Sequence, residues 1–221
     1  MIEFRDVTVT YPQAERPAIE NLNFHVPMHG FLFITGESGA GKTTILRLIT
    51  KELEPTKGDI LINGKSICKM KRREIPIYRR RIGFVSQEVG LLEDKTVYEN
   101  VELVKRVVGA KPDTIRIQVA MALKTVGMEP YYQSYPRELS GGQRKKICIA
   151  RAIANHPDIL LADEPTGDLD PDSSLEIMNL FSELHNRGMT VLVVTHDRVA
   201  VEKLQYPQMK LQRGIYEDYS E

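Results

Sequence analysis

Hydrophobic and polar residues alternate with a period of two over the first part of the chain. The alternation covers residues 2–9 and 22–26, and an unbroken apolar run follows at 31–34. A period of two predicts half-buried strands, and a short apolar run before a glycine-rich stretch predicts a buried one. We therefore expect residues 1–35 to form mainly strands, separated by a turn-rich stretch at 11–17.

Further strands and a helix are predicted after this region. Residues 41–51 have the spacing of a helix, and residues 58–62 form a strand pattern that ends in the turn dipeptide Asn63-Gly64. Residues 82–86 form another short strand pattern, with Gln87 directly after it. The first part of the chain thus predicts both strand and helix.

The pattern changes to helical spacing in the middle of the chain. Helices are predicted over 97–108, 113–126 and 142–154, the second opening with Pro112-Asp113 as a start signal. Strand patterns return at 159–162 and 191–194, separated by a helix over 171–187 that Gly188 ends. Alternation of strand and helix predicts a parallel sheet. We expect one domain over 1–221, with an α/β core at about 1–87 and 157–221 and a helical subdomain inserted at about 88–156.

A glycine-rich loop lies between the apolar run at 31–34 and the helical stretch that follows. Residues 36–43 read Gly-Glu-Ser-Gly-Ala-Gly-Lys-Thr, which fits the pattern G-x-x-x-x-G-K-[ST]. In such a loop backbone N–H groups surround phosphates, the lysine adds a positive charge, and the threonine offers Mg²⁺ a hydroxyl. Phosphate would also meet the N-terminus of a helix. The loop therefore predicts a nucleotide phosphate site.

Two adjacent carboxylates end the strand predicted at 159–162. Asp163 can reach a Mg²⁺ ion held by Thr43 and the phosphates, and Glu164 can orient or deprotonate a water that attacks the γ-phosphate. Taken alone, Asp163 is also consistent with an ordinary turn residue, and Glu164 with an ordinary surface residue. The phosphate loop upstream favours the catalytic interpretation.

A second short motif, Leu139-Ser140-Gly141-Gly142-Gln143, precedes the helix predicted at 142–154. Ser140 suits the N-cap position, and the two glycines expose N–H groups at the positive end of the helix. We refer to residues 139–143 as the signature motif. On its own it predicts a helix cap and nothing more.

Composition and charge narrow the classes of protein that fit. The chain has 221 residues, 42% of them hydrophobic, and its 30 basic and 30 acidic residues give a formal net charge of zero. A neutral chain argues against a generally cationic nucleic-acid binder. The two cysteines, Cys68 and Cys148, lack metal-ligand spacing. No apolar run approaches the ~20 residues of a spanning helix, and no secretion signal is evident. We expect a protein that is neither secreted nor embedded in a membrane by itself.

Taken together, these motifs in this order resemble the ATP-binding cassette (ABC) ATPases over almost the whole chain. The resemblance implies an α/β fold of the P-loop NTPase class, with a mainly parallel sheet, an N-terminal antiparallel β subdomain and an inserted helical subdomain. It also implies ATP hydrolysis and a head-to-tail dimer, in which the signature motif of one protomer completes the ATP site of the other.

The resemblance assigns a role to each matching residue. It implies adenine stacking by Tyr11, sensing of Mg²⁺ and of a membrane partner by Gln87, and a contact of His196 with the γ-phosphate. The catalytic residues are expected to be Glu164, His196 and Lys42, and the metal ligands Thr43, Gln87 and Asp163. Nucleotide is expected to contact Tyr11, Gly36, Glu37, Ser38, Gly39, Ala40, Gly41, Lys42, Thr43, Thr44, Gln87, Ser140, Gly141, Gly142 and Gln143.

The middle segment narrows the resemblance further. Residues 73–83, Leu91-Leu92 and residues 96–101 are similar to the FtsE group of ABC ATPases. That group implies a membrane partner, FtsX, whose movement switches cell-wall hydrolases outside the cell during division. The ATPase subunits of lipoprotein-release and macrolide exporters remain the alternative, with an exporter permease as partner. Soluble ABC proteins of DNA repair or translation fit less well, since they generally carry a coiled-coil insertion or two fused cassettes.

The expected ligands and location follow from this resemblance. ATP and Mg²⁺ are the expected cofactors, and ATP binding is expected to bring two copies together. The chain is expected at the cytoplasmic face of the plasma membrane, held there by its membrane partner. The basic cluster between Lys69 and Arg81 fits either a solvated face or a contact with lipid or a partner.

Overall fold

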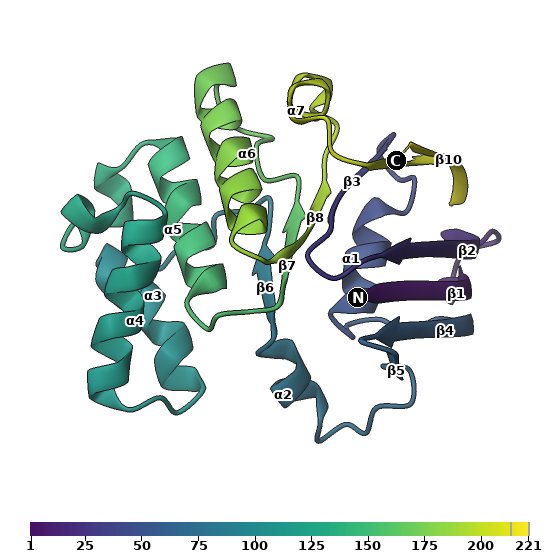
Figure 1. The fold of residues 1–221 in the computed structure, drawn as a ribbon, viewed down its shortest axis with the longest axis horizontal. Coiled ribbons are helices and arrows are strands. Elements are labelled where there is room, and N and C mark those ends of the chain that lie inside the picture. Colours follow the sequence, from purple (N-terminus) through teal and green to yellow (C-terminus); the bar gives the residue numbers. More distant parts are fainter. Residues whose placement is uncertain (213, 221) are drawn as a thin grey trace.

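The computed structural model describes residues 1–212 and 214–220, with the backbone alone for 215–220. Two sheets and the helices around them make up the fold (Figure 1). The element order is β1 (Ile2–Val9), β2 (Ile19–Val26), β3 (Phe31–Gly36), α1 (Lys42–Ile49), β4 (Lys57–Ile62), β5 (Lys65–Ser66), α2 (Ile75–Arg79), β6 (Ile82–Val85), α3 (Val97–Val107), α4 (Pro112–Thr125), η1 (Glu129–Tyr131), η2 (Pro136–Glu138), α5 (Gly141–Ile153), β7 (Ile159–Asp163), α6 (Pro171–Asn186), β8 (Thr190–Val194), α7 (Arg198–Leu204), β9 (Gln208–Gln212) and β10 (Ile215–Ser220).

The larger sheet is mainly parallel, as predicted. Its order is β10-β9-β3-β8-β7-β6, and only the β9–β10 pair is antiparallel among the paired strands described. The smaller sheet, β2-β1-β4-β5, is antiparallel and forms one side of the molecule (Figure 1). The α/β fold with an antiparallel N-terminal part is therefore confirmed.

Both faces of the parallel sheet are buried, and each face belongs to a different hydrophobic core. In β3, Phe31 and Phe33 pack with α3 to α6, whereas Leu32 and Ile34 pack with α1 and the antiparallel sheet. The same alternation divides β7 and β8 between the two cores. Burial on both faces explains why these strands read as unbroken apolar runs rather than as alternating patterns.

The helices predicted in the middle of the chain are present, with small differences at their ends. Helices α3, α4 and α5 contact one another and lie to one side of the parallel sheet (Figure 1). Thr96 caps α3 through its side chain, which accepts a hydrogen bond from Glu99 N, and the carboxylate of Glu99 accepts one from Thr96 N. The position of the proposed subdomain boundaries at 87 and 157 stays a prediction.

Helix α2 is not predicted by the sequence pattern, because five residues containing Pro76 are too short to show a helical period. Its side chains complete the end of α1. The Tyr78 hydroxyl donates to Ile49 O over 2.6 Å, and Arg79 donates to the carbonyls of Thr50 and Lys51. These contacts satisfy backbone acceptors that a helix leaves free at its C-terminus.

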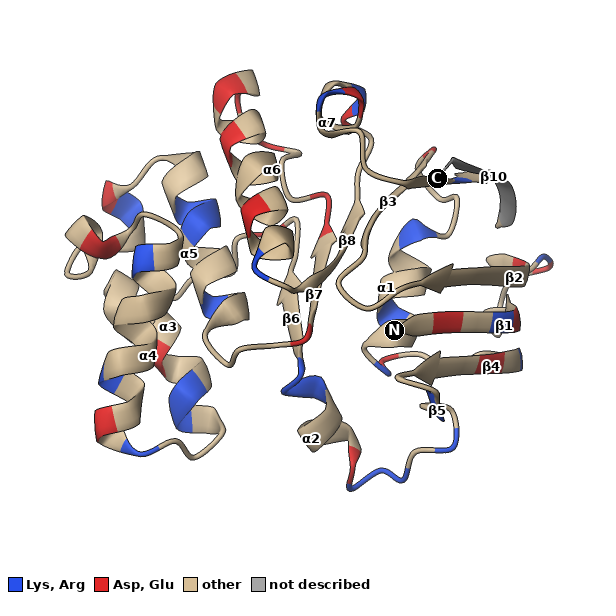
Figure 2. Ribbon diagram, viewed as in Figure 1, with Lys and Arg blue, Asp and Glu red and all other residues tan. Residues whose placement is uncertain are grey.

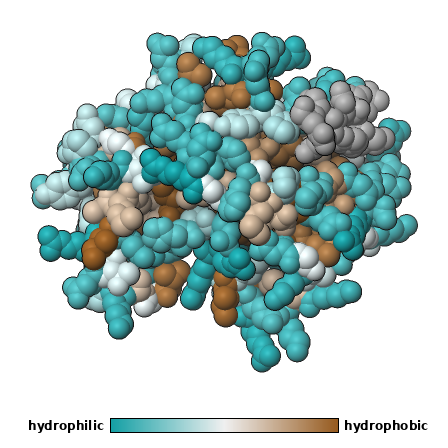
Figure 3. Space-filling view, in the orientation of Figure 1, coloured by the Kyte–Doolittle hydropathy of each residue, from teal (hydrophilic) through white to brown (hydrophobic). Residues whose placement is uncertain are grey.

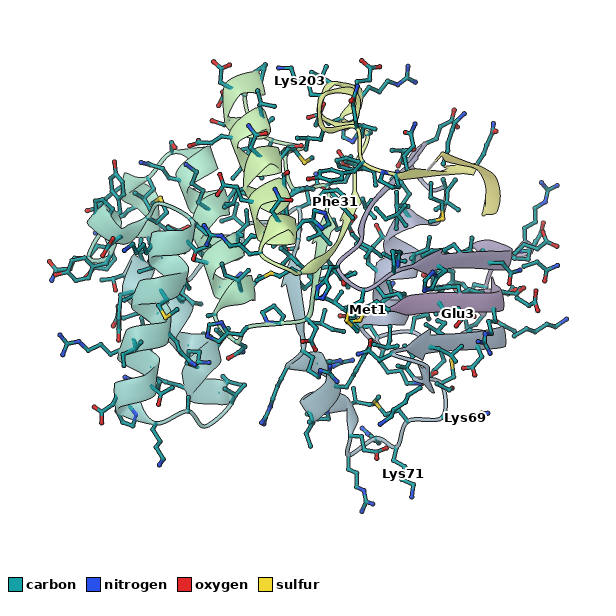
Figure 4. The ribbon with its side chains drawn as sticks, in the orientation of Figure 1. Met1, Glu3, Phe31, Lys69, Lys71 and Lys203 are labelled. Carbon is teal, nitrogen blue, oxygen red and sulfur yellow. The ribbon has the colours of Figure 1, made fainter. Side chains whose placement is uncertain are left out.

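The basic cluster lies on α2 and on the loop that leads to it, visible as a run of blue (Figure 2). The side chains of Lys69 and Lys71 point away from the ribbon (Figure 4). Arg81 is paired with Asp158 over 2.6 Å, and Arg79 belongs to the cap of α1. Part of the cluster therefore has a structural role, which the sequence did not reveal.

Candidate active site

The glycine-rich loop joins β3 to α1 and requires glycine at two points. Gly36 has φ 143° and Gly41 has φ 100°, both in the left-handed region. A Cβ at Gly36 would lie 2.2 Å from Leu211 O, and one at Gly41 would lie 2.5 Å from Ala18 O. Both the backbone angles and the close backbone neighbours exclude a side chain there. The loop thus has a fixed shape that leads into the N-terminus of α1.

Lys42 is the first residue of α1, and its side chain folds back over the loop. Its Nζ donates to Gly36 O over 2.8 Å and to Glu37 O over 3.0 Å, and only 9% of the side chain is exposed. The ammonium is therefore held over the loop by the carbonyls of Gly36 and Glu37, at the residue that begins α1. A phosphate bound in the loop would meet positive charge and N–H donors together.

Asp163 ends β7 beside the hydroxyl of Thr43. Burial raises the pKa of the Asp163 carboxyl above its ordinary value; the hydrogen bond from Thr43 opposes this effect, and the neighbouring Glu164 carboxylate adds to it. A carboxylate and a hydroxyl are oxygen ligands of the kind that Mg²⁺ takes. Among the described residues, no cluster of three or more His, Cys, Asp and Glu side chains could hold a metal. Thr43 and Asp163 thus offer two oxygen ligands that a Mg²⁺ ion beside bound phosphates could use.

Glu164 and His196 form a pair across the ends of β7 and β8. The Glu164 Oε2 atom lies 2.8 Å from His196 Nδ1 and accepts a hydrogen bond from His196 N over 3.2 Å. The other carboxylate oxygen lies 3.9 Å from Lys42 Nζ. The Glu164 side chain is 16% exposed and that of His196 71% exposed. The pair therefore presents an accessible imidazole next to a shielded carboxylate.

The backbone at Glu164 is strained. Its φ is 45°, an uncommon angle for a residue with a side chain, and its N–H donates to Val194 O over 2.9 Å. Because β7 and β8 are neighbours in the sheet, this bond fixes the turn after β7 against the end of β8. Strain of this kind persists where surrounding contacts hold it and is frequent at active sites.

Gln87 and Tyr11 border the same region from two other segments. A Cβ at Gly167 would lie 3.4 Å from Gln87 Nε2, and Gly167 N donates to Glu164 O, so the Gln87 amide packs against the turn that carries Glu164. The Tyr11 hydroxyl lies 3.2 Å from Thr44 Oγ1 at the start of α1. Gln87 thus lies beside the turn that carries Glu164, and Tyr11 lies beside the start of α1, which follows the phosphate loop.

The signature motif begins α5 with a complete capping box. Ser140 Oγ accepts a hydrogen bond from Gln143 N, and Gln143 Oε1 accepts one from Ser140 N. This confirms Ser140 as an N-cap. Helix α5 belongs to the core on one face of the parallel sheet, whereas α1 belongs to the core on the other face. Figure 1 shows α1 and α5 on opposite sides of the strands.

One protomer therefore assembles most of the predicted site but not all of it. The ends of β3, β7 and β8 and the start of α1 bring together the phosphate loop, Asp163, Glu164 and His196, with Gln87 beside them. Ser140, Gly141, Gly142 and Gln143 lie at the start of a helix on the other face of the sheet.

Lys145 contacts the Gln87 segment and is not among the residues predicted from the sequence. Lys145 is 3% exposed, and its Nζ donates to Gln87 O over 2.6 Å. The sequence does carry a signal for the burial of Lys145. It stands three residues before Cys148 and four before Ile149, both buried, so helical spacing places it on the apolar face of α5.

Comparison with known proteins agrees with this geometry. The sequence profile of the ABC transporter family matches residues 19–167. The cell division ATP-binding protein FtsE of Bacillus subtilis (strain 168) is 40% identical over 97% of this chain and 94% of its own length. FtsE of Haemophilus influenzae is 42% identical over 97% of this chain and 98% of its own. The ATP-binding cassette MJ0796, solved as a dimer in a post-hydrolysis state with ADP and Pi, superposes with a TM-score of 0.87 at 35% identity, covering 100% of this chain and 98% of that one.

A phosphate loop, an acidic strand end and a capped signature helix on a parallel sheet define a nucleotide hydrolase of the cassette type. The chain belongs to the ABC transporter family, as an ATP-hydrolysing cassette. Within that family, its similarity to the FtsE proteins covers nearly its whole length.

No helix among the described residues is long and apolar enough to cross a membrane. The face of the molecule in Figure 3 is mainly hydrophilic, and its hydrophobic residues lie in small separate groups.

Proposed function

We propose that this chain is the ATP-binding and ATP-hydrolysing subunit of an FtsEX-type complex. In this role, ATP binding and hydrolysis change the conformation of the membrane protein FtsX and thereby regulate peptidoglycan hydrolases during cell division. The observation that carries the proposal is the 39–42% identity to FtsE proteins over 97–98% of the chain. The cassette would then act at the cytoplasmic face of the plasma membrane, attached through FtsX.

The phosphate loop would bind the triphosphate. Lys42 would leave the carbonyls of Gly36 and Glu37 and pair with the β- and γ-phosphates, while the N–H groups of residues 37–44 surround them. Thr43 and Asp163 would hold Mg²⁺, with the Gln87 amide as a further oxygen ligand. When bound, the ion neutralises charge on the phosphates. Tyr11 would carry the adenine.

Glu164 would act on the attacking water. Its carboxylate is shielded and held by His196 and by the nearby Lys42, so it can accept a proton or orient a water without being drawn into solvent. The exposed His196 imidazole would contact the γ-phosphate, and the bond to Glu164 fixes the direction of its ring.

The second half of each ATP site would come from another copy of the chain. The capped start of α5 exposes Ser140 and Gly141, and neither residue lies in the phosphate loop's own core. Donors at a helix N-terminus attract anions. Two copies related by a two-fold axis would thus enclose two ATP molecules between phosphate loops and signature motifs.

We expect the Glu164→Gln protein to sediment as a dimer with ATP and as a monomer with ADP. Blocked hydrolysis should preserve the γ-phosphate that joins the two protomers, at protein concentrations of about tens of micromolar. Analytical ultracentrifugation with each nucleotide measures this. A monomer in both nucleotides would contradict the ATP-dependent dimer.

A second variant, Gly141→Asp in the same background, serves as the control. An acidic residue in the first turn of α5 agrees with the helix dipole and should leave the monomer folded. Its carboxylate would, however, face the partner's γ-phosphate, so ATP should no longer induce the dimer.

We further propose that residues 88–156 move as a helical subdomain and that the surface from Gln87 to Asn100 receives a cytoplasmic helix of FtsX. The loop before α3 is held in place by the buried Asn100 side chain, which accepts a hydrogen bond from Leu92 N and donates one to Leu92 O. Leu92 itself is 42% exposed. A cavity of about 610 Å³ lies close by, lined by residues that include Tyr98, Arg116 and Tyr132.

Charge reversal at Asp94 together with Leu92→Ser should weaken recruitment to membranes that contain the partner by about tenfold, while ATP affinity stays unchanged. An exposed apolar anchor and a charge in one interface typically give an effect of this size. Glu93 and Glu99 are poor probes, because Glu93 pairs with Arg144 and Glu99 caps α3. Co-sedimentation with partner-containing vesicles is the measurement, with exposed Glu183→Lys on α6 as control. Equal recruitment of all variants would exclude this docking surface.

The partner itself decides between an FtsEX-type complex and an exporter. The chain, tagged and purified from detergent-extracted membranes of its own cells, should bring down one membrane protein. A protein with a modest external domain supports FtsX, and a permease with a large periplasmic domain supports a lipoprotein-release or macrolide exporter.

A further inference from the structure

Helix α5 holds the segment that follows β6 by a row of side-chain donors. Lys145 Nζ donates to Ser86 O over 3.0 Å and to Gln87 O over 2.6 Å. Cys148 Sγ donates to Val89 O, and Arg151 Nη1 donates to Gly90 O over 2.8 Å. These three residues, the donor row, stand at intervals of three along one face of α5. Four carbonyls of residues 86–90, the carbonyl segment, thus accept hydrogen bonds from this one helix.

Lys145 is the most unusual member of the donor row. Its side chain is buried, and burial lowers the pKa of its ammonium group. A buried ammonium is costly unless hydrogen bonds compensate it. Lys145 Nζ donates to two backbone carbonyls, and the carboxylate of Asp168 provides a further favourable interaction. The position therefore costs stability unless the carbonyl segment stays in place.

Two functional elements meet through this contact. The signature motif begins the helix that carries Lys145, and Gln87 lies in the carbonyl segment, with its amide against the turn of Glu164 and Gly167. A shift of α5 would move Gln87 relative to that turn. Loss of Lys145 would leave the carbonyls of Ser86 and Gln87 without these donors and free Gln87 to shift on its own.

We propose that Lys145 is a positioning residue for Gln87. Through its hydrogen bonds to the carbonyls of Ser86 and Gln87, Lys145 links the position of the Gln87 amide at the γ-phosphate to the position of α5, the helix that the signature motif begins. This inference rests on the role of Gln87 in the proposed function. Lys145 touches neither nucleotide nor the attacking water and acts only through Gln87.

The test compares Lys145→Met with Lys105→Met. Lys105 is a matched control: it is 5% exposed, lies in the neighbouring helix α3, and donates to Asn155 Oδ1 over 2.9 Å rather than to the carbonyl segment. For each protein we measure kcat, the affinities for ADP and for a non-hydrolysable ATP analogue, and the melting temperature. Lys145→Met should lower kcat and the affinity for the analogue by about tenfold and leave ADP affinity unchanged, because ADP lacks the γ-phosphate. Lys105→Met should leave kcat and the preference for the analogue over ADP unchanged.

A double-mutant cycle separates this inference from the proposed function. In a Gln87→Ala background, Lys145→Met should have no further effect on kcat, since Gln87→Ala has already removed the amide that Lys145 is proposed to position, although the backbone carbonyl of residue 87 remains. Independent, additive losses would overturn the inference. An equal loss of affinity for ADP and for the ATP analogue would also overturn it, because such a loss marks a general loss of structure.

The Gln87→Ala protein alone tells the two failures apart. If it keeps the preference for the ATP analogue over ADP, both the role of Gln87 and the inference fail. If it loses that preference and Lys145→Met does not alter it, only the inference fails.

Lys145→Gln covers the case in which the methionine variant does not fold. A glutamine amide can still donate to one carbonyl but carries no charge. Its kcat and its preference for the ATP analogue over ADP should fall between those of the parental and Gln87→Ala proteins. Parental values for this variant would show that the ammonium is not required and would overturn the inference.

Discussion

The Glu164→Gln protein should bind ATP with parental affinity and hydrolyse it at least about 10²-fold more slowly, the loss expected when a general base is removed. The substitution keeps the shape of the side chain. Both contacts with His196 are made by Glu164 Oε2, and the amide oxygen of glutamine in that place can still accept from His196 N and from an Nδ1–H group. The geometry of the turn is therefore retained, and only the ability to accept a proton from water is lost.

Steady-state phosphate release and nucleotide titration on the purified variant test this expectation. Glu183→Gln, an exposed carboxylate on α6, makes the same chemical change away from the site and should hydrolyse ATP normally. Parental turnover by Glu164→Gln would mean that another group activates the water, and the proposed roles of Glu164 and His196 would have to be abandoned.

Lys42→Ala should lose affinity for ATP by about 10²-fold and lose turnover as well. Charge-assisted hydrogen bonds from an ammonium to phosphate stabilise both the bound state and the transition state. Without Lys42, the carbonyls of Gly36 and Glu37 also lose their donor, and Glu164 loses a nearby positive charge. In a cell, this variant would fail to close a dimer, whereas Glu164→Gln would fail to reopen it.

Lys51→Ala provides the matched control for Lys42→Ala. Lys51 is also a buried lysine, but it follows the C-terminal end of α1 and pairs there with Glu54. Removal of a buried ammonium at that end should lower the melting temperature and leave nucleotide affinity near parental. Isothermal titration with ATP and ADP distinguishes the two effects. Equal affinity in Lys42→Ala and the parental protein would contradict the role of the phosphate loop.

Long periodic segments could be predicted from the sequence because burial dictates their patterns. The strands of the parallel sheet are covered on both faces, so apolar runs at 31–34, 159–162 and 191–194 located them. Helices α3 to α6 are long enough for their apolar faces to repeat. Short elements such as α2 and α7 contain too few residues for a repeat. Strand β9 did carry a signal, since Met209 and Leu211 alternate with exposed residues.

The site was predicted as a set of residues, but its internal contacts were not. Motif spacing placed Glu164 and His196 at strand ends, yet the contact between them depends on β7 and β8 being neighbours, which strand patterns leave open. The strained φ of Glu164 likewise follows from tertiary contacts. Lys145 and Lys146 look alike in a basic run, although Lys145 is buried and Lys146 pairs with Glu176 on α6.

The contact between Gly36 and Leu211 has a consequence for synthesis of the chain. The phosphate loop takes its shape against β9, which pairs with β3 in register from Phe33 to Gly36 although it is translated last among the strands that flank the loop. A nascent chain that has emerged only as far as α6 has made the whole glycine-rich motif but lacks the strand that supports it. We therefore expect competence to bind nucleotide to come late in translation, once β9 has paired with β3 and the phosphate loop has its support.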